Sequence, residues 1–255
     1  MVDSNPLICF DSHDVLLLGA GGRLAREIKR RWQNINAVPR EDCDITDINR
    51  ISEICESRPK IIINCAAMTD LNYCENHILE TWKVNVSGVK NIAKVAGEIG
   101  AYMVHFSSNY AVNPVNEYGK MKLASEQFVP GLVLRTAFYN KDHWLFRSLE
   151  ERCPVSLLTN YYFNPITAAG LLDYMEKLIG REYRGVINIG TRDRVTYHDF
   201  GLKLCEAFGF DKGLIDPVES LEVGYKYPCD SYLELDQLEE IGLQIRSISE
   251  DFQSL

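Results

Sequence analysis

The sequence predicts an α/β protein built on a doubly wound parallel sheet, and three observations lead to this fold class. Short, almost uniformly apolar runs at Val15 to Leu18, Lys60 to Asn64 and Tyr102 to Phe106 are typical of strands that are covered on both faces. Longer segments with helical character separate these runs, and the alternation of strand and helix is typical of a parallel sheet. Glycines, small residues and serines follow directly after the strands, where such sheets bind their ligands.

The elements of the first half follow this alternation without interruption. Thr46 or Asp47 is a plausible N-cap for the second helix, and Pro59 ends that helix. Pro114 breaks the chain before the fourth helix. Strands are expected at 15–18, 35–38, 60–64 and 102–106, and helices from about 22 to 32, from 46 or 47 to 58, from 78 to 99 with Gly88 inside, and around Tyr118 and Lys122.

The second half repeats the pattern less regularly. Strands are expected at 132–135, 155–158 and 185–189, and helices around 143–151, 168–179, 197–208 and 235–241. We therefore divide the chain into a tail (1–14), a dinucleotide-binding domain that carries the catalytic residues (15–135), and a mixed segment (136–255). This last segment is expected to complete the sheet and to form a small substrate lobe.

Composition limits the classes of function. The 255 residues carry a formal net charge of -9, which argues against nucleic acid or an anionic membrane surface as a partner. The first fourteen residues lack the basic and apolar regions of a signal peptide, and no apolar run is long enough to span a membrane, so we expect a cytoplasmic protein. The eight cysteines and five histidines show no spacing typical of a metal site, and none is predicted.

A glycine-containing turn follows the first strand, in the order G-A-G-G-R-L-A from Gly19 to Ala25. Glycine permits a tight turn and a close approach of the backbone to a ligand, and the helix N-terminus offers free N–H groups to a pyrophosphate. The turn therefore predicts a dinucleotide site of the Rossmann type. An unliganded turn between strand and helix is the plainer interpretation of the same residues.

Two further positions bear on the cofactor. Arg40 lies just after the second strand, where an arginine favours the 2′-phosphate of NADP and an acidic residue favours NAD. With Arg23 beside the glycine turn, Arg40 favours NADPH, although Glu41 and Asp42 follow it directly and NADH stays possible. The small residues Ala66 and Ala67 end the third strand and leave room for the cofactor.

The chemistry is expected at Tyr118 and Lys122, which lie one helical turn apart on one face. A nearby ammonium lowers the pKa of a phenol, and a phenol so placed can protonate a carbonyl oxygen while hydride reaches its carbon. Ser107 and Ser108 can hydrogen-bond the same oxygen. The plainer interpretation is a tyrosine at a helix start with a solvated lysine one turn on.

Together these pieces resemble the extended short-chain dehydrogenase/reductases, and within them most closely the dTDP-4-dehydrorhamnose reductase family. The resemblance runs almost end to end, through G-A-G-G-R-L-A-R-E-I, D-C-D-I-T-D, R-P-K-I-I-I-N-C-A-A-M-T, V-N-V-S-G-V-K-N-I-A, V-H-F-S-S-N-Y, Y-G-K-M-K-L-A-S-E and L-R-T. It implies reduction of the 4-keto group of a nucleotide-linked 6-deoxysugar by a reduced nicotinamide cofactor. Family members often form dimers, so a homodimer is possible here.

The resemblance also implies roles for single residues. Tyr118 becomes the proton donor, Lys122 the residue that lowers the pKa of Tyr118 and holds the nicotinamide ribose, and Ser108 the hydroxyl beside the carbonyl. The implied cofactor contacts are Gly19, Gly22, Arg23, Leu24, Arg40, Asp44, Ile45, Ala66, Ala67, Asn85, Tyr118 and Lys122, and the implied substrate contacts are Thr69, Ser108, Asn109 and Phe138. A buried side chain that satisfies backbone groups is the plainer interpretation of Asn85.

The departures from the family pattern all lie on the substrate side. Ser108 and Tyr118 are only ten residues apart, where the family has a longer loop that helps to enclose the sugar nucleotide. Asn109 replaces an Asp, Phe138 replaces a Trp, and the segment 164–167 reads N-P-I-T. These departures favour a reductase with a different substrate. They leave open a dinucleotide-binding regulatory subunit without catalysis and a redox-neutral epimerase or dehydratase.

Overall fold

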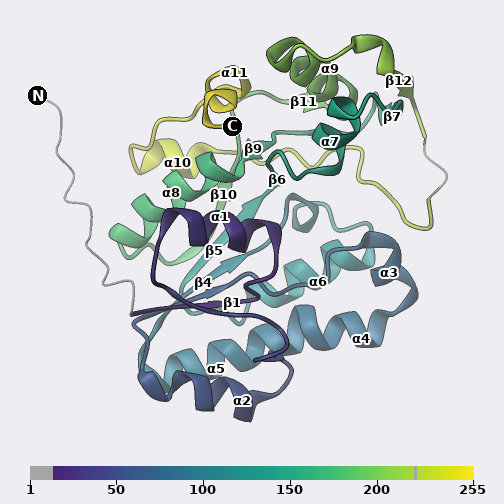
Figure 1. The fold of residues 1–255 in the computed structure, drawn as a ribbon. Helices are drawn as coiled ribbons and strands as arrows, with labels where there is room; N and C mark the ends of the chain where they lie inside the picture. Colours follow the sequence, from purple (N-terminus) through teal and green to yellow (C-terminus); the bar gives the residue numbers. More distant parts are fainter. Residues whose placement is uncertain (1–13, 221–222) are drawn as a thin grey trace, which may run out of the picture.

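A sheet of six parallel strands forms the centre of the computed structural model, which describes residues 14–220 and 223–255 (Figure 1). The strand order is β10-β5-β4-β3-β1-β2. This arrangement confirms the predicted fold class, whereas all but the last residue of the predicted tail lies outside the described residues. The strand bounds are β1 (Val15–Leu18), β2 (Asn36–Val38), β3 (Ile61–Asn64), β4 (Tyr102–Phe106), β5 (Leu132–Thr136) and β10 (Gly185–Ile189).

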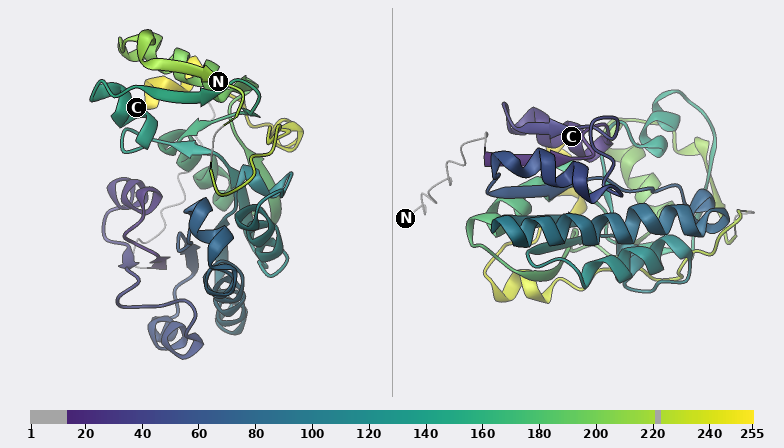
Figure 2. Two further views of the ribbon diagram at one scale, coloured as in Figure 1. Left: turned by 90° about the vertical axis from the view of Figure 1, so that its right-hand side faces the viewer. Right: turned by 90° about the horizontal axis from the view of Figure 1, so that it is seen from below.

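Helices cover both faces of this sheet because alternate strand residues point to opposite sides. Val15 and Leu17 pack with α1 (Arg23–Arg31) and α8 (Ala168–Gly180). Leu16 and Leu18 pack on the other face, with α2 (Ile48–Ile54) and α5 (Val89–Ile99). Figure 2 shows the same layering from two further directions. Burial on both faces explains why β1 is apolar throughout.

The helix predicted from 78 to 99 is confirmed as one continuous helical run, with a π-helical turn that the sequence did not predict. It consists of α4 (Ile78–Trp82), a π-helical turn (Lys83–Gly88) and α5, and an additional helix α3 (Leu71–Asn76) precedes it. The π-helical turn carries Asn85, whose side chain bonds the backbone of Met68. Gly88 allows close packing of this turn, because a Cβ there would lie 2.6 Å from Cδ1 of Ile45. These tertiary contacts leave the helical periodicity of the sequence unchanged, so the sequence pattern did not reveal them.

Most of the segment after β5 forms an aromatic-rich layer above the carboxyl ends of the strands (Figure 1). Its core includes Tyr139, Phe163 and Phe200. Three strand pairs of two to four residues organise it, most of them too short to produce a pattern in the sequence. The bounds are β6 (Phe138–Tyr139), α7 (Trp144–Glu150), β7 (Val155–Leu158), β8 (Tyr162–Phe163), β9 (Ile166–Thr167), β11 (Val195–Thr196), α9 (Tyr197–Phe208) and β12 (Ile215–Val218), with β6 paired to β9, β7 to β12 and β8 to β11.

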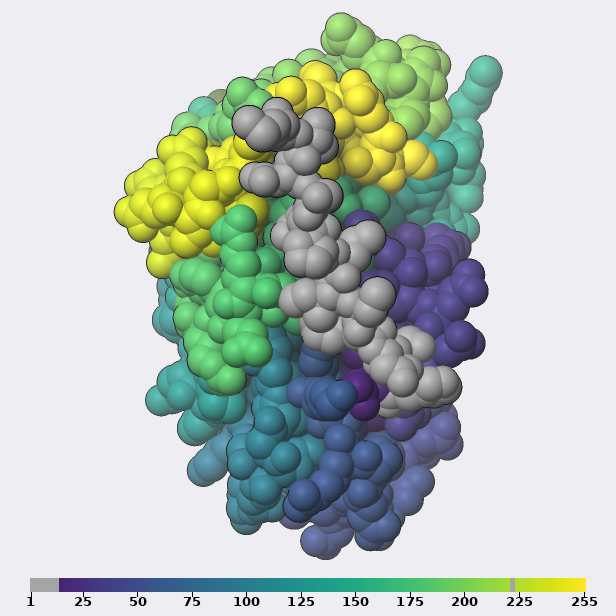
Figure 3. Space-filling view, turned by 90° about the vertical axis from the view of Figure 1, so that its left-hand side faces the viewer, coloured from purple at the N-terminus to yellow at the C-terminus, as the bar shows by residue number. Residues whose placement is uncertain are grey.

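The chain ends with α10 (Asp236–Glu240) and α11 (Ile248–Asp251), which return to α8 (Figure 3). Asp251 is fully buried, and it accepts hydrogen bonds from the backbone N of Thr167 at 2.6 Å and from its Oγ1 at 2.8 Å. Burial raises the pKa of this carboxyl group, and the bonds from Thr167 oppose the rise. Arg246 also pairs with Asp173 of α8 at 2.6 Å. The last residues therefore fix the start of α8 against β9.

Across the described ranges, every helix is too short or too polar to cross a bilayer.

Candidate functional site

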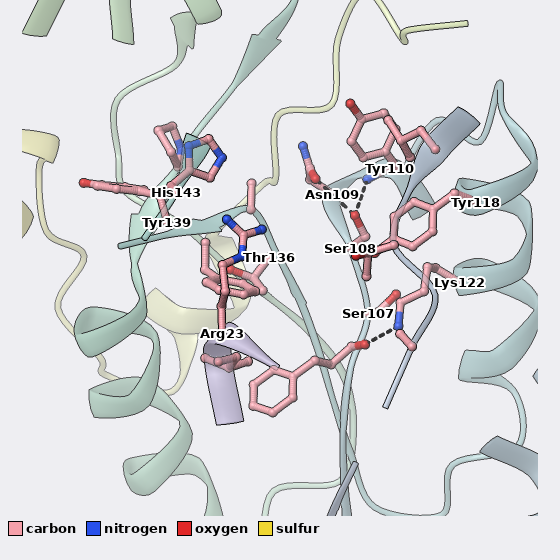
Figure 4. Close-up of a pocket in the computed structure, with 18 of the residues that line it drawn as sticks. Arg23, Ser107, Ser108, Asn109, Tyr110, Tyr118, Lys122, Thr136, Tyr139 and His143 are labelled. Carbon is pink, nitrogen blue, oxygen red and sulfur yellow. Dashed lines mark hydrogen bonds between the residues drawn. The ribbon is translucent and has the colours of Figure 1, made fainter. Parts of the chain in front are cut away.

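A pocket of about 520 Å³ lies between the carboxyl ends of the strands and the aromatic-rich layer (Figure 4). The sheet side contributes the start of α1, the residues after β3 and β4, and the face of α6 (Glu117–Glu126). The other side is contributed by residues from Ala137 to Tyr227. Most of the residues that the sequence singled out line this pocket: Gly22, Arg23, Leu24, Ala66, Ala67, Thr69, Ser108, Asn109, Tyr118, Lys122 and Phe138.

The glycine turn brings the start of α1 against the end of β3. Gly19 has a φ of +80°, and a Cβ on it would lie 2.5 Å from the backbone N of Ala66. Gly22 is the N-cap of α1, and a Cβ there would meet only the carbonyl oxygen of Gly19 at 3.6 Å. Gly19 is therefore required by the fold itself, whereas Gly22 has room beside it and faces the pocket.

We expect Gly19→Ala to destabilise the protein by about 2–5 kcal/mol, since it combines a left-handed φ with overlap against the backbone that follows β3. Gly21→Ala is the matched control in the same turn, because a Cβ at Gly21 has no neighbour within 4 Å. Chemical denaturation of both variants is the measurement. Equal stability of the two variants would show that the turn adjusts to the added Cβ without a loss of stability.

The first turn of α1 suits a phosphate group. It has no acidic residue and no side-chain cap, so its N–H groups are free for a ligand at the end that borders the pocket. The Arg23 guanidinium lies 5.9 Å from the centre of the Phe138 ring. A dinucleotide pyrophosphate fits this combination of free N–H groups, an adjacent cation and an exposed glycine.

Tyr118, Lys122 and Ser108 come together on one side of the pocket (Figure 4). Asn116 caps α6 by accepting from the N–H of Gly119 at 2.8 Å, which fixes the first turn that carries Tyr118. The Ser108 hydroxyl accepts from the N–H of Tyr110 and lies near Asn109 Oδ1, both at 3.2 Å. Burial raises the pKa of Tyr118 to about 12, and hydrogen bonding with Ser108 opposes the rise. Tyr118 is therefore protonated at neutral pH, as a proton donor must be.

Lys122 differs from its expected role in one respect. Its ammonium donates to the carbonyl oxygen of Phe106 at 2.5 Å, and Ser108, rather than Lys122, is the group that lowers the pKa of Tyr118 here. Burial lowers the pKa of Lys122 itself to about 8, against the opposing charge of Glu126. An ammonium has three N–H donors, so the bond to Phe106 leaves two of them for a ligand in the pocket that Lys122 lines.

A series of buried hydrogen bonds connects the end of β3, on one side of the pocket, to α6. Ala66 N donates to Asn64 Oδ1 at 3.0 Å, and Asn64 Nδ2 meets His105 Nδ1 at 3.1 Å. His105 Nε2 lies 3.2 Å from Ser125 Oγ, which donates to the carbonyl oxygen of Lys122 at 2.7 Å. Burial lowers the pKa of His105 well below its usual value, so its ring is neutral. These hydrogen bonds hold Ala66 and the helical turn of Lys122 at fixed positions.

Asn109 connects the end of β4 to the aromatic-rich layer. Its Nδ2 donates to the hydroxyl of Tyr161 at 2.9 Å and to Ser231 Oγ at 2.7 Å, and the residue is 3% exposed. The Asn therefore serves as a donor to two hydroxyl oxygens, which an ionised Asp in its place cannot do. Asn109 lines the pocket, but this amide nitrogen is engaged within the protein.

Five of the expected cofactor residues lie away from the pocket lining. Gly19 shapes the turn between β1 and α1. Arg40 is exposed, and its guanidinium pairs with the carboxylate of Asp44 at 3.7 Å. Asp44 also accepts from the N and Oγ1 of Thr46, and hydrogen bonding to the Thr46 backbone is the main cause of its lowered pKa. Ile45 is 3% exposed and belongs to the core. The fifth residue is Asn85.

In this structure Asn85 is a buried side chain that satisfies backbone groups, which is the plainer of the two interpretations given for it. Its Oδ1 accepts from Met68 N at 2.8 Å and its Nδ2 donates to Met68 O at 2.9 Å. It thereby holds the loop after β3, which contributes Ala66, Ala67 and Thr69 to the pocket. Asn85 supports this wall of the pocket without lining it.

The sequence did not reveal the far wall of the pocket, which is almost entirely aromatic. Tyr110 lies 6.1 Å from both Tyr118 and Tyr161, measured between ring centres. The hydroxyls of Tyr225 and Tyr227 are 2.6 Å apart. The residues of this wall are Tyr139, His143, Trp144, Tyr161, Phe163, Tyr197, Phe200, Tyr225 and Tyr227, and Tyr110 adds a further ring on the side of Tyr118. The one available signal was the abundance of Tyr and Phe between 138 and 227, which does not separate core from pocket.

A comparison with protein families decides the relationship. The model described as "RmlD substrate binding domain" matches residues 13–255, nearly the whole chain. The chain belongs to the RmlD substrate binding domain family. The resemblance predicted from the sequence is confirmed.

Individual relatives of this RmlD-family chain are distant and cover most of its length. It is 26% identical to a dTDP-4-keto-6-deoxy-D-glucose reductase of Streptomyces niveus over 89% of this chain and 91% of the relative. It is 24% identical to the methionine adenosyltransferase 2 subunit beta of Bos taurus, over 91% and 84% of the two chains. Among solved structures, the dTDP-4-dehydrorhamnose reductase of Bacillus anthracis in complex with NADP has the same fold, with a TM-score of 0.85, 23% identity and coverage of 94% and 99%.

Proposed function

We propose that this protein is an NADPH-dependent reductase of a nucleotide-activated keto-deoxysugar. The observation that carries the proposal is the convergence of Tyr118, Lys122 and Ser108 on the pocket that the N-terminus of α1 also borders. The family membership and the similarity to a nucleotide-sugar reductase support it.

In this proposal, the residues of the chain act on the ketone oxygen. A reduced nicotinamide cofactor, when bound, supplies the hydride. Tyr118 donates its phenolic proton to the oxygen, and Ser108 orients that oxygen by a hydrogen bond. The Lys122 ammonium stabilises the charge that develops on Tyr118 as it loses the proton, and its remaining N–H groups are available to hold the cofactor ribose.

The cofactor preference rests on arginine. Arg40 follows β2, its side chain is 65% exposed, and its acidic partner, Asp44, is 3.7 Å away. A side chain so loosely paired can turn to the 2′-phosphate of NADPH.

We expect Arg40→Ser to raise KM for NADPH at least about tenfold, because one charge-assisted phosphate contact is worth roughly 1.5–3 kcal/mol. KM for NADH should stay unchanged. Arg50→Ser is the control, since Arg50 is a neighbouring surface arginine that pairs with Glu53 of α2. Steady-state kinetics with both cofactors measure the effect, and an equal loss with NADH would refute the assignment of the phosphate.

The proposed substrate class rests on the aromatic wall and on the short loop between Ser108 and Tyr118. Aromatic rings bind the apolar face of a sugar or a nucleobase by stacking, and their hydroxyls bond to sugar hydroxyls. Because the loop that would cover the sugar is short, we propose that Trp144 and Tyr225 border the substrate instead. Trp144 is 47% exposed at the start of α7.

A second candidate function is that of a dinucleotide-binding regulatory subunit. The similarity to the methionine adenosyltransferase 2 subunit beta favours it. A regulatory role leaves the arrangement of Tyr118, Lys122 and Ser108 without a purpose, so we place it second.

The deciding experiment is oxidation of NADPH and NADH by the purified protein against a panel of nucleotide-linked 4-keto-6-deoxysugars. Turnover with NADPH supports the reductase. Tight dinucleotide binding without net oxidation on any ketone would overturn it in favour of a redox-neutral enzyme or the regulatory subunit. Co-purification with an unrelated enzyme would single out the latter.

A further inference from the structure

A buried ion pair lies directly behind the pocket. Glu126 at the end of α6 is 8% exposed, and both its carboxylate oxygens bond to Arg135 of β5. Arg135 Nε lies 2.9 Å from Oε1 and Nη2 lies 2.6 Å from Oε2. This fork geometry fixes the carboxylate in the plane of the guanidinium and makes it an acceptor only.

Ser107 is the third member of this group. Its hydroxyl lies 2.5 Å from Glu126 Oε1, and since the carboxylate only accepts, the serine must donate. A hydroxyl has a single proton, so Ser107 has no proton left for a ligand. Ser107 nevertheless lines the pocket, where its lone pairs can only accept.

The two adjacent serines therefore have opposite capabilities. Ser108 accepts from the N–H of Tyr110, and its hydroxyl lies 3.2 Å from Asn109 Oδ1 and hydrogen-bonds with Tyr118. It has no carboxylate partner that holds its proton, so it can donate to a ketone oxygen. Ser107 would repel that oxygen, because both would be acceptors. With its proton bonded to Glu126, Ser107 is therefore not expected to share the carbonyl oxygen with Ser108.

The position of Ser107 indicates which ligand it meets. Asn64 pairs with His105 in the register of β3 and β4, so Ala66 and Ser107 follow at the same level of the two neighbouring chains. Ala66 belongs to the wall beside the start of α1, and Figure 4 draws Ser107 with Lys122 and Tyr118, across the pocket from Tyr139 and His143. Ser107 thus lies on the cofactor side of the pocket.

We propose that Ser107 is a cofactor-binding residue that accepts a hydrogen bond from an N–H or O–H of the nicotinamide riboside, and that Glu126, fixed by Arg135, is the positioning residue that imposes this acceptor role. The donors of that part of the cofactor are the carboxamide N–H and the ribose hydroxyls. The inference rests on the proposed function, because it names a contact of the same cofactor.

The test is direct titration of NADPH and of 2′,5′-ADP, which lacks the nicotinamide riboside together with its phosphate, against Ser107→Ala, Ser107→Thr and the unmodified protein. We expect Ser107→Ala to weaken NADPH binding about five- to tenfold, the range of one lost hydrogen bond. Binding of 2′,5′-ADP should be unchanged, and Ser107→Thr, which keeps the hydroxyl, should restore most of the NADPH affinity. A purely structural role would weaken both ligands alike and would overturn the proposal, as would an unchanged affinity for NADPH.

The role of Glu126 is tested by a double-mutant cycle. Glu126→Gln can no longer hold the serine as an obligate donor, so it should weaken NADPH binding selectively, and combining it with Ser107→Ala should add less than about twofold. Additive losses would show that Glu126 acts independently of Ser107. If the unmodified protein binds 2′,5′-ADP and NADPH equally weakly, the proposed function fails as a whole. That result differs from a loss of selectivity that appears in Ser107→Ala alone.

Discussion

Tyr118→Phe should lower kcat by about 10²–10⁴, the range that a positioned general acid contributes. The substitution removes one oxygen from a fully formed helix, and the ring keeps its contact with Tyr110 at 6.1 Å between centres. Because the pKa of Tyr118 is raised to about 12, its proton is present over the whole working range of pH. The loss should therefore be equal at about pH 6 and about pH 8.

Tyr225→Phe is the matched control for this loss. Tyr225 also lines the pocket, and its hydroxyl bonds to that of Tyr227. We expect it to alter KM for the sugar and to leave kcat within a few fold. NADPH affinity, measured by fluorescence titration, should be the same in both variants and the unmodified protein. A Tyr118→Phe enzyme with most of its kcat would exclude the tyrosine as proton donor.

Lys122 should make activity and stability respond to pH in opposite directions. Its pKa is lowered from 10.5 to about 8 by burial, so activity that needs the ammonium falls as the pH rises through about 8. Tyr118 remains protonated there and does not contribute to that fall.

The sign for stability follows from proton binding. Between about pH 8 and 10.5 the unfolded chain keeps the Lys122 proton while the folded protein has lost it, so the free energy of unfolding rises with pH in that window. The free-energy cost of burying the charged Lys122 side chain is fully present below about pH 8. At about 1.36 kcal/mol per pKa unit, the loss of this cost across the window stabilises the folded protein by roughly 3 kcal/mol. Denaturant titrations at about pH 7.5 and about pH 10 measure the change.

Lys122→Met should abolish both effects, with kcat reduced at least about a hundredfold and no Lys122 contribution to the pH dependence. Lys120→Met is the control on the same helix, since Lys120 is half-exposed and pairs with Glu117. If Lys122→Met leaves the stability difference between the two pH values unchanged, the buried ammonium is not its source.

The sheet and the pairing of Tyr118 with Lys122 on one helix face were predictable because their signals are local. A strand buried on both faces is apolar throughout, and a spacing of four residues places Tyr118 and Lys122 on one helix face whatever surrounds them. The orientation of the Lys122 ammonium toward Phe106 was not predictable, because it depends on where β4 ends relative to α6. The same holds for Asn85, whose partner Met68 lies on another segment.

The aromatic wall escaped prediction for a different reason. Its residues are brought together by strand pairs such as β8 with β11, which have two residues each and leave no periodicity. Apolar and aromatic residues in such segments are equally consistent with a core and with a pocket lining. Only the tertiary arrangement separates Tyr227, which borders the pocket, from Phe252, which does not.

The bonds of Asn109 have a consequence for the order in which the site is assembled. They join the residue next to Ser108 to Tyr161 and to Ser231, 122 positions further along the chain than Asn109. During synthesis the sheet strands β1 to β5 emerge before either partner exists, so the dinucleotide turn can form while the Ser108 loop is still unanchored. We therefore expect a chain that ends before Ser231 to lack one of the two bonds that anchor the residue next to Ser108, and to lose turnover.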